Sequence, residues 1–360
     1  MKIIGKAVGL IFLVFLLSSC QSSESEESED VSPEDEADQS QVQPADESIE
    51  TGEGNDESKT EQTINDEMGE SGEEQSNNED QEESSSEENI ETAGSYSDFD
   101  ESPNYFVESH TYDSGHEFLT AFLIDRNEGS GIQFDERLHT SLIESDPSEQ
   151  NIFESFSDLS TKWPTLEIYF DAEENELSTT TAQTTLFYDS LIGISDLYGI
   201  EEIQFFNAES EQDITVAQRL VDAPIIVKDE RGETRGYYTI YDAHLEQTLF
   251  LPGGVLDESI VDVNDELLSF PETIEAMGTV ENEATFYGSA IVEGLEVVDA
   301  SYENGVASVE YVMDETHVTE ADRIVFERAI QLAALDFHAS ELYLVNDTLK
   351  ENVKYPLIEQ

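Results

Sequence analysis

Residues 295–346 have the most regular apolar pattern in the chain, and that pattern limits the folds open to the rest. Apolar and polar residues alternate on both sides of Asn304-Gly305, which predicts two strands joined by a tight hairpin turn. A capping-box pattern at Thr319 then opens a helical apolar face. The expected elements are strands at 295–300 and 306–313, a helix at 319–338 and a strand at 342–346.

A degenerate copy of the second half of this pattern lies upstream, at residues 165–207. It predicts a strand at 165–171, a helix at 179–198 that ends at Gly199, and a strand at 203–207. The two copies close on similar strings, YGIEEIQFFN and FHASELYLVN, whose final residues Asn207 and Asn346 are 139 positions apart. This spacing indicates an internal duplication of about one small domain.

The remaining patterns complete an α+β chain. Strands are expected at 116–125, 236–241 and 249–251, a short helix at 134–144, and a helical segment at 262–277 interrupted at Pro271, while 152–159 fits a strand or a helix. We therefore expect two tandem small domains, each a short mixed or antiparallel sheet packed by two helices, after a disordered acidic tether.

The N-terminus indicates an extracytoplasmic address. Two lysines precede an apolar run at residues 7–17, which is too short to span a bilayer and matches a secretory signal. The run ends in Leu-Ser-Ser-Cys, which fits a bacterial lipobox with Cys20 as the acylated residue. Cys20 is the only cysteine in the sequence. The alternative to the lipobox interpretation is a free thiol at Cys20 or a signal segment that stays uncleaved as an anchor. Residues 1–20 are interpreted as a lipoprotein signal, which places the mature chain on the outer face of the cell membrane.

Acidic residues dominate both the segment after Cys20 and the rest of the chain. Residues 21–100 hold 30 acidic residues and one basic residue, and residues 101–360 hold 55 and 11. Residues 21–102 are poor in apolar side chains and are expected to be a disordered acidic linker, acting as a stalk or alternatively as a cation reservoir or a partner tail. A net charge of −71 disfavours nucleic-acid binding and indicates a halophilic host.

The sequence holds no pattern typical of catalysis. Gly-rich phosphate loops, nucleophile elbows, zinc-helix motifs and calcium loops are missing from it. The six histidines are scattered; a metal role for the pair His110 and His116 is weak, and His338 is expected to satisfy the carbonyls of a helix end. The acidic cluster at 262–266 is interpreted as a solvated face. No catalytic residue, metal ligand, cofactor or small-molecule substrate is expected.

The string GLEVVDASYENGVASVEYVMDE, with AIQLAALDFHASELYLVND after it, resembles the sporulation and spore germination (GerMN) domain of GerM-type lipoproteins. The hairpin likeness rests on Asn304, Gly305, Val306, Ala307 and Val309, and the last-strand likeness on Leu342, Leu344, Val345 and Asn346. The resemblance implies two GerMN-like domains, a degenerate one at 103–222 and a second at 223–360. It also implies a scaffold in sporulation or germination that binds envelope or sporulation proteins in a Gram-positive cell.

Residues 235–277 are similar to the extracytoplasmic half of the negative regulator of sigma-X activity. That likeness implies an extracytoplasmic sensor as the alternative function, although only six residues precede the apolar run, where those regulators carry a sigma-binding region. An envelope hydrolase is a more distant third reading. Both leading hypotheses place the protein at the membrane, anchored through the lipid on Cys20.

Replacing Cys20 tests that address directly. Cys20→Ala removes the sulfur that would carry the lipid, so we expect the protein to leave the membrane fraction or to keep its signal peptide. The readouts are membrane fractionation and the mass of the N-terminal peptide. If the variant stayed in the membrane fraction with an acylated N-terminal peptide, the lipobox interpretation would be contradicted.

Overall fold

The computed structural model describes the chain from residue 96 onward. The described residues are 96–126, 131–171, 177–207, 214–280 and 286–358. The chain divides into two compact units, Met1–Ser84 and Ser85–Gln360, and all of the described residues lie in the second. The signal segment, Cys20 and the linker up to residue 95 lie outside the described residues, so the expectations for them stay predictions. No helix in the described residues is long and apolar enough to cross a membrane.

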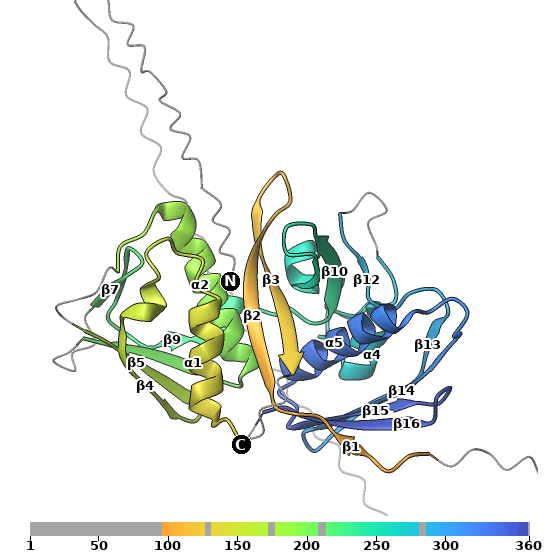
Figure 1. The fold of residues 1–360 in the computed structure, drawn as a ribbon. Coiled ribbons are helices and arrows are strands. Elements are labelled where there is room, and N and C mark those ends of the chain that lie inside the picture. Colours follow the sequence, from red (N-terminus) through yellow and green to blue (C-terminus); the bar gives the residue numbers. More distant parts are fainter. Residues whose placement is uncertain (1–95, 127–130, 172–176, 208–213, 281–285, 359–360) are drawn as a thin grey trace, which may run out of the picture. The chain divides into compact units, whose positions relative to one another are not determined.

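Two sheets of the structure have the same topology, and each is the centre of one repeat (Figure 1). The first runs in the order β4-β5-β6-β9 and the second in the order β13-β14-β15-β16. In both, the successive pairs are antiparallel, parallel and antiparallel, and a helix connects the parallel pair. The first repeat contains β4 (Phe156–Lys162), β5 (Thr165–Phe170), α2 (Thr181–Leu197), β6 (Glu202–Phe206) and β9 (Ile225–Ile226). The second contains β13 (Leu295–Glu303), β14 (Val306–Met313), α5 (Glu320–Asp336), β15 (Glu341–Asn346) and β16 (Glu351–Pro356).

The two long helices start and stop in the same way. Thr180 and Thr319 each cap a 17-residue helix with a capping box, and they lie 139 residues apart. Gly199 and His338, also 139 residues apart, take the left-handed conformation just past the helix ends. The spacing seen in the sequence therefore holds from the cap of each helix through the turn that ends it.

Alternating side chains of each sheet meet the helix across one core. Leu166, Ile168 and Phe170 of β5 are fully buried, as are Phe187, Leu191 and Ile194 of α2. Their counterparts, Ala307, Val309 and Tyr311 of β14 and Phe326, Ile330 and Ala333 of α5, are buried as well. These are the faces that the period-2 and helical patterns predicted.

A third sheet joins the two repeats, because each supplies a hairpin to it. Its order is β12-β10-β11-β3-β2, so the β2–β3 hairpin of the first repeat lies beside the β10–β11 hairpin of the second. The junction is the antiparallel pairing of Phe122 with Phe250. The strands are β2 (Tyr105–Asp113), β3 (Phe118–Arg126), β10 (Tyr237–Asp242), β11 (Gln247–Pro252) and β12 (Gly288–Ser289). The α+β fold class with two tandem units is confirmed, while the boundary at residue 222 stays a prediction.

Shorter elements fill the connections between these sheets. They are β1 (Asp100–Glu101), α1 (Phe134–Glu144), η1 (Ile152–Ser155), β7 (Ile214–Val216), β8 (Arg219–Val221), α3 (Val227–Arg231), η2 (Gly253–Leu256) and α4 (Phe270–Ala276). Helix α1 has the bounds that the sequence predicted, and the ambiguous 152–159 segment is divided between η1 and β4. Pairing of β1 with β16 is parallel and extends the second repeat's sheet by one strand.

Several segments differ from the sequence expectations. The prediction of a helical segment at 262–277 was wrong in its first half, where the residues form a turn around Asp262. Pro271 lies in the first turn of α4, where a backbone N–H would have no partner within the helix, so proline is tolerated there. Strand β2 was not predicted, and neither were the shorter strands β7, β8, β9 and β12 or the last strand, β16. Residues 96–101, placed in the linker, are in contact with the second repeat, where Phe99 packs edge-on against Tyr343.

Arg126, at the end of β3, fastens the first repeat to the second. Its guanidinium donates hydrogen bonds to the carbonyl oxygens of Pro103 and Pro356, at 2.8 Å each, and to Oε1 of Gln331 at 2.9 Å. The rings of Tyr105 and Tyr355 lie 5.4 and 5.0 Å from it. Burial lowers the pKa of Arg126 to about 10, because neutral oxygens and rings surround the guanidinium and no carboxylate of the described residues offsets its loss of water.

The Asn304-Gly305 turn gives a stability prediction. Asn304 and Gly305 have φ of 53° and 80°, the positive values that a two-residue type I′ hairpin needs. Gly305→Val places a β-branched side chain at positive φ, so we expect the free energy of unfolding to fall by about 1 kcal/mol or more. Gly305→Asn is the control and should lose less, since Asn tolerates this conformation. Equal stability of the Val variant and the parent in urea unfolding would contradict this account of the turn.

Candidate functional site at the junction of the repeats

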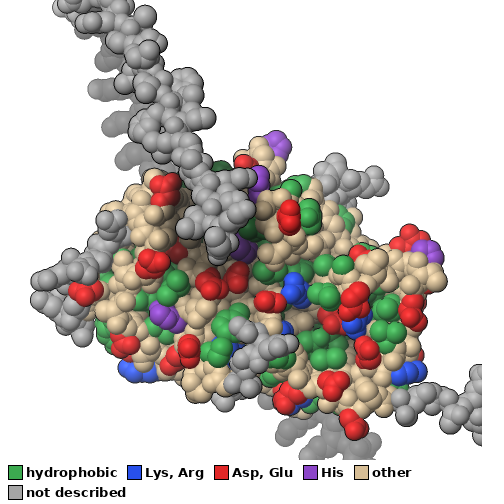
Figure 2. Space-filling model, viewed as in Figure 1, with side chains coloured by type: hydrophobic (Ala, Val, Ile, Leu, Met, Phe, Trp, Pro, Cys, Tyr) green, Lys and Arg blue, Asp and Glu red, His purple; other side chains and the backbone are tan. Residues whose placement is uncertain are grey.

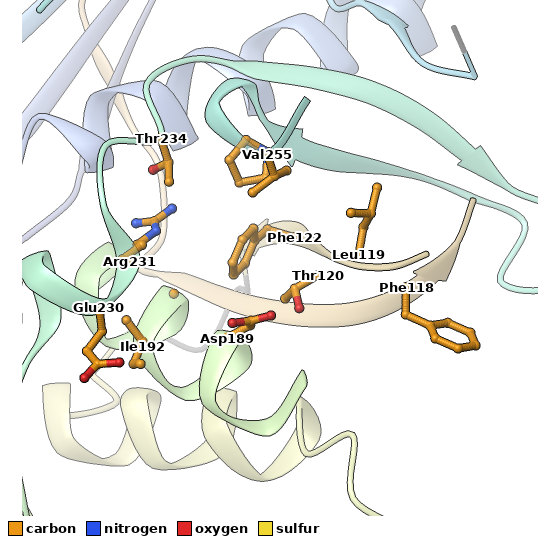
Figure 3. Close-up of a pocket in the computed structure, with 12 residues that line it drawn as sticks. Phe118, Leu119, Thr120, Phe122, Asp189, Ile192, Glu230, Arg231, Thr234 and Val255 are labelled. Carbon is orange, nitrogen blue, oxygen red and sulfur yellow. The ribbon is translucent and has the colours of Figure 1, made fainter. Parts of the chain in front are cut away.

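A pocket of about 150 Å³ lies where the two repeats meet (Figure 3). Four segments line it: β3, the middle of α2, the end of α3 with the loop after it, and the end of β11 with η2. The lining residues are Phe118, Leu119, Thr120, Phe122, Asp189, Ile192, Gly193, Glu230, Arg231, Thr234, Pro252 and Val255. We call it the junction pocket. Its volume suits a single side chain rather than a typical small-molecule ligand.

The floor of the junction pocket is the Phe122 ring, which is 3% exposed. Gly193 lets this ring lie directly on α2, because a Cβ at that position would be 2.5 Å from Cζ of Phe122. The Arg231 guanidinium carbon lies 5.7 Å from the ring centroid. Phe122 also makes the Phe122–Phe250 strand pairing, so the pocket floor and the junction of the hairpins are the same residue.

Behind the floor, Arg231 is shared by two carboxylates from different repeats. Its side chain is 7% exposed and forms ion pairs with Asp196 near the end of α2 and, at 3.2 Å, with Asp336 at the end of α5. The Tyr237 hydroxyl accepts a bond from Arg231 at 3.0 Å and donates one to Asp336 at 2.9 Å. His338 completes the group through a 3.2 Å contact with Asp196. We call these five residues the junction cluster.

The cluster lies at the C-terminal ends of both long helices, whose unpaired carbonyls carry partial negative charge. Arg231 cannot neutralise both carboxylates as well as the helix ends. The positive charges of Arg231 and His338 lower the pKa of Asp196 despite its burial. Burial, with Asp196 close by, raises the pKa of Asp336 to about 7. The hydrogen bond to Asp196 in turn raises the pKa of His338.

The structure gives His338 a different role from the one expected. The sequence suggested that its imidazole satisfies the carbonyls of its own helix end, whereas the ring reaches Asp196 of the first repeat, 142 residues away. Among the other histidines, His110 approaches Glu108 at 3.5 Å, His317 approaches Asp314 at 2.8 Å, and the His139 ring stacks on Phe156. The Asp262 carboxylate accepts hydrogen bonds from the backbone N–H groups of Asn264 and Glu266, which is typical of an aspartate in a turn.

Within the described residues, no group of three or more His, Cys, Asp or Glu side chains could hold a metal ion. The junction cluster contains acids, a base and a hydroxyl, yet its side chains are directed at one another. Sequence reasoning did not select Phe122, Asp189, Asp196, Arg231 or Asp336. Arg231 stands out in retrospect as one of only 14 basic residues in the chain.

No family model and no curated protein matches the chain. Comparison with solved structures finds the tandem GerMN domains of the sporulation protein GerM from Bacillus subtilis, at 10% sequence identity and a TM-score of 0.39. The match covers 71% of this chain and 99% of that chain. That structure is of the family that residues 295–346 resemble. The comparisons give no support to the likeness to the sigma-X regulator.

The junction cluster predicts a stability that falls as the pH rises. The pKa of Asp336 is about 7 in the folded state against 3.8 in the unfolded chain, so folding favours its protonated form and loses that advantage above pH 4. His338, whose pKa is also raised by folding, acts in the same direction at higher pH. Asp336→Asn cannot ionise, so its stability relative to the parent should rise by about 2 kcal/mol between about pH 5 and pH 8.

Urea unfolding of the parent and Asp336→Asn at both pH values measures this difference. Asp299→Asn, an exposed carboxylate on β13, is the matched control and should track the parent at both. If the stability difference between Asp336→Asn and the parent did not change with pH, the claim that folding favours protonated Asp336 would be contradicted.

Proposed function

We propose that this chain is a membrane-anchored extracytoplasmic lipoprotein that acts as a binding or scaffold module in sporulation or spore germination, without catalysis. The observation that carries the proposal is the repeated unit itself. The second copy, β13-β14-α5-β15, contains the residues that resemble the GerM-type domain, and the first copy has the same topology at nearly constant spacing.

The junction favours binding over chemistry. Its buried acids and base are engaged with each other in the junction cluster, and its pocket is of side-chain size. A substrate-processing site needs a nucleophile, acid or base directed at a space where the reacting atoms can lie. The described titratable groups of the cluster are used to join the repeats instead, and the described lining of the pocket itself presents a single unpaired acid, Asp189. The lipobox at Cys20 supplies the proposed address at the outer face of the membrane.

Deletion and complementation in the host test this function. We expect deletion of the gene to lower the yield of heat-resistant spores, or their germination, with no change in vegetative growth. The full chain should restore the phenotype, and Cys20→Ala should not, because a scaffold that leaves the membrane no longer meets envelope partners. Crosslinking of the tagged full chain should recover the same envelope proteins only from sporulating cells.

A deletion strain that sporulates and germinates normally would contradict the proposal. If that strain instead changed its response to envelope stress during vegetative growth, the sensor function would replace the scaffold function. Hydrolysis of peptidoglycan by the purified chain would overturn the assignment as a non-enzyme.

A further inference from the structure

The junction pocket contains one charged group without a partner, the carboxylate of Asp189. It makes no hydrogen bond or ion pair to the described part of the chain, and desolvation is the cause of its raised pKa. Figure 3 shows the carboxylate beside Thr120 and below the Phe122 ring. Asp189 itself is exposed, so an incoming group can reach it.

The other charges at the pocket are already neutralised. Glu230 is held by Arg219 in a two-bond ion pair, at 2.6 and 3.1 Å. Arg231 is held by Asp196 and Asp336 of the junction cluster. No unpaired cation of the described lining therefore competes for Asp189, and the pocket as a whole offers one negative charge above an apolar floor.

This arrangement is specific to the first repeat. Counting 139 residues from the helix caps, Asp189 corresponds to Arg328 and Gly193 to Leu332. Arg328 is paired with Asp125 at 2.9 Å, and Leu332 is fully buried. At the corresponding positions the second repeat has a buried leucine and an arginine paired with a carboxylate. In the first repeat the Phe122 ring lies on Gly193, and Asp189 has no partner within the described residues. The pocket is a divergence between two copies of one unit rather than a consequence of the fold.

We propose that the junction pocket binds the side chain of a lysine or arginine presented by an extracytoplasmic protein partner. The aliphatic stem of such a side chain would lie on Phe122, Ile192 and Val255, and its charged end would meet Asp189. The surface favours this choice: Figure 2 shows acidic side chains spread over the visible face with few basic ones among them. A net charge of −44 over residues 101–360 attracts a basic segment over distance.

This inference rests on the proposed binding function and names the chemistry of its partner. The probe is a fluorescent peptide of glycine, serine and leucine around a single arginine, titrated against the purified full chain at about 0.15 M salt. A peptide with citrulline in place of arginine keeps the shape and removes the charge. We expect the arginine peptide to bind at least about five-fold more tightly than the citrulline peptide.

Two matched pairs of variants locate the binding. Asp189→Asn should weaken binding of the arginine peptide at least about five-fold, whereas Asp299→Asn, with the same charge change at an exposed site on β13, should leave it unchanged. Val255→Arg places a cation at the pocket rim and should abolish binding. Val263→Arg, at a fully exposed loop position, makes the same substitution and should not.

If the two variants of each pair changed peptide binding equally, the peptide would be bound by the overall negative charge of the chain, including that of the acidic linker. That result would overturn the pocket assignment. Displacement by free spermidine at equal concentration would assign the site to a small polyamine and overturn the protein partner. If Asp189→Asn still crosslinks its envelope proteins in sporulating cells, the pocket inference fails while the scaffold function stands. If the peptide results hold but deletion leaves sporulation normal, the scaffold function fails and the pocket assignment stands.

Discussion

The arrangement of the two repeats depends on one buried cation between two buried carboxylates. Arg231 lies where α2 and α5 both end, and its partners Asp196 and Asp336 belong to different repeats. Removing it would leave two acids and two helix ends together out of water, which costs far more than the loss of one exposed ion pair. Tyr237 and His338 add hydrogen bonds to the two acids, so each of these five side chains depends on the positions of the others.

The shared sheet and the junction cluster are two separate devices that join the repeats. A duplicated unit with a short sheet leaves a strand edge and a helix end to cover. The hairpins form a separate sheet by pairing with each other at Phe122 and Phe250, and the cluster covers the helix ends. Both devices meet at Phe122, whose ring lies on Gly193, and the pocket beside that ring is lined from α2 by Asp189. The binding chemistry that we propose therefore lies at the joint and not within either copy.

The local patterns of the sequence were sufficient for the strand-helix-strand centre of each repeat, but not for the outer strands β9 and β16. The Asn304-Gly305 turn, the capping box at Thr319 and the helical apolar faces are signals contained within a few residues. Strand β2 was missed because its apolar alternation stops at Ser109, which is buried and satisfied by Ser145 and Ser190. Pro271 marked the start of a helix, where the pattern alone allowed an interruption.

The junction could not be read from the sequence, because it is made of contacts over long separations. Nothing near Phe122 indicates that it pairs with Phe250, and His338 finds its acid 142 residues upstream. Once the repeats are superposed by their helix caps, however, the divergence of Asp189 from Arg328 is visible in the sequence itself. A search for duplicated positions that change charge would have selected this residue.

The most direct test of the account is whether the two repeats unfold as one body. Trp163 is the only tryptophan and lies between β4 and β5 of the first repeat, so its fluorescence reports on that repeat, while far-ultraviolet circular dichroism reports on the secondary structure of both. In urea, the shared sheet and the Arg231 cluster predict coincident transitions with a single midpoint. Two separate transitions, with the tryptophan signal complete before or after the dichroism change, would contradict a common junction.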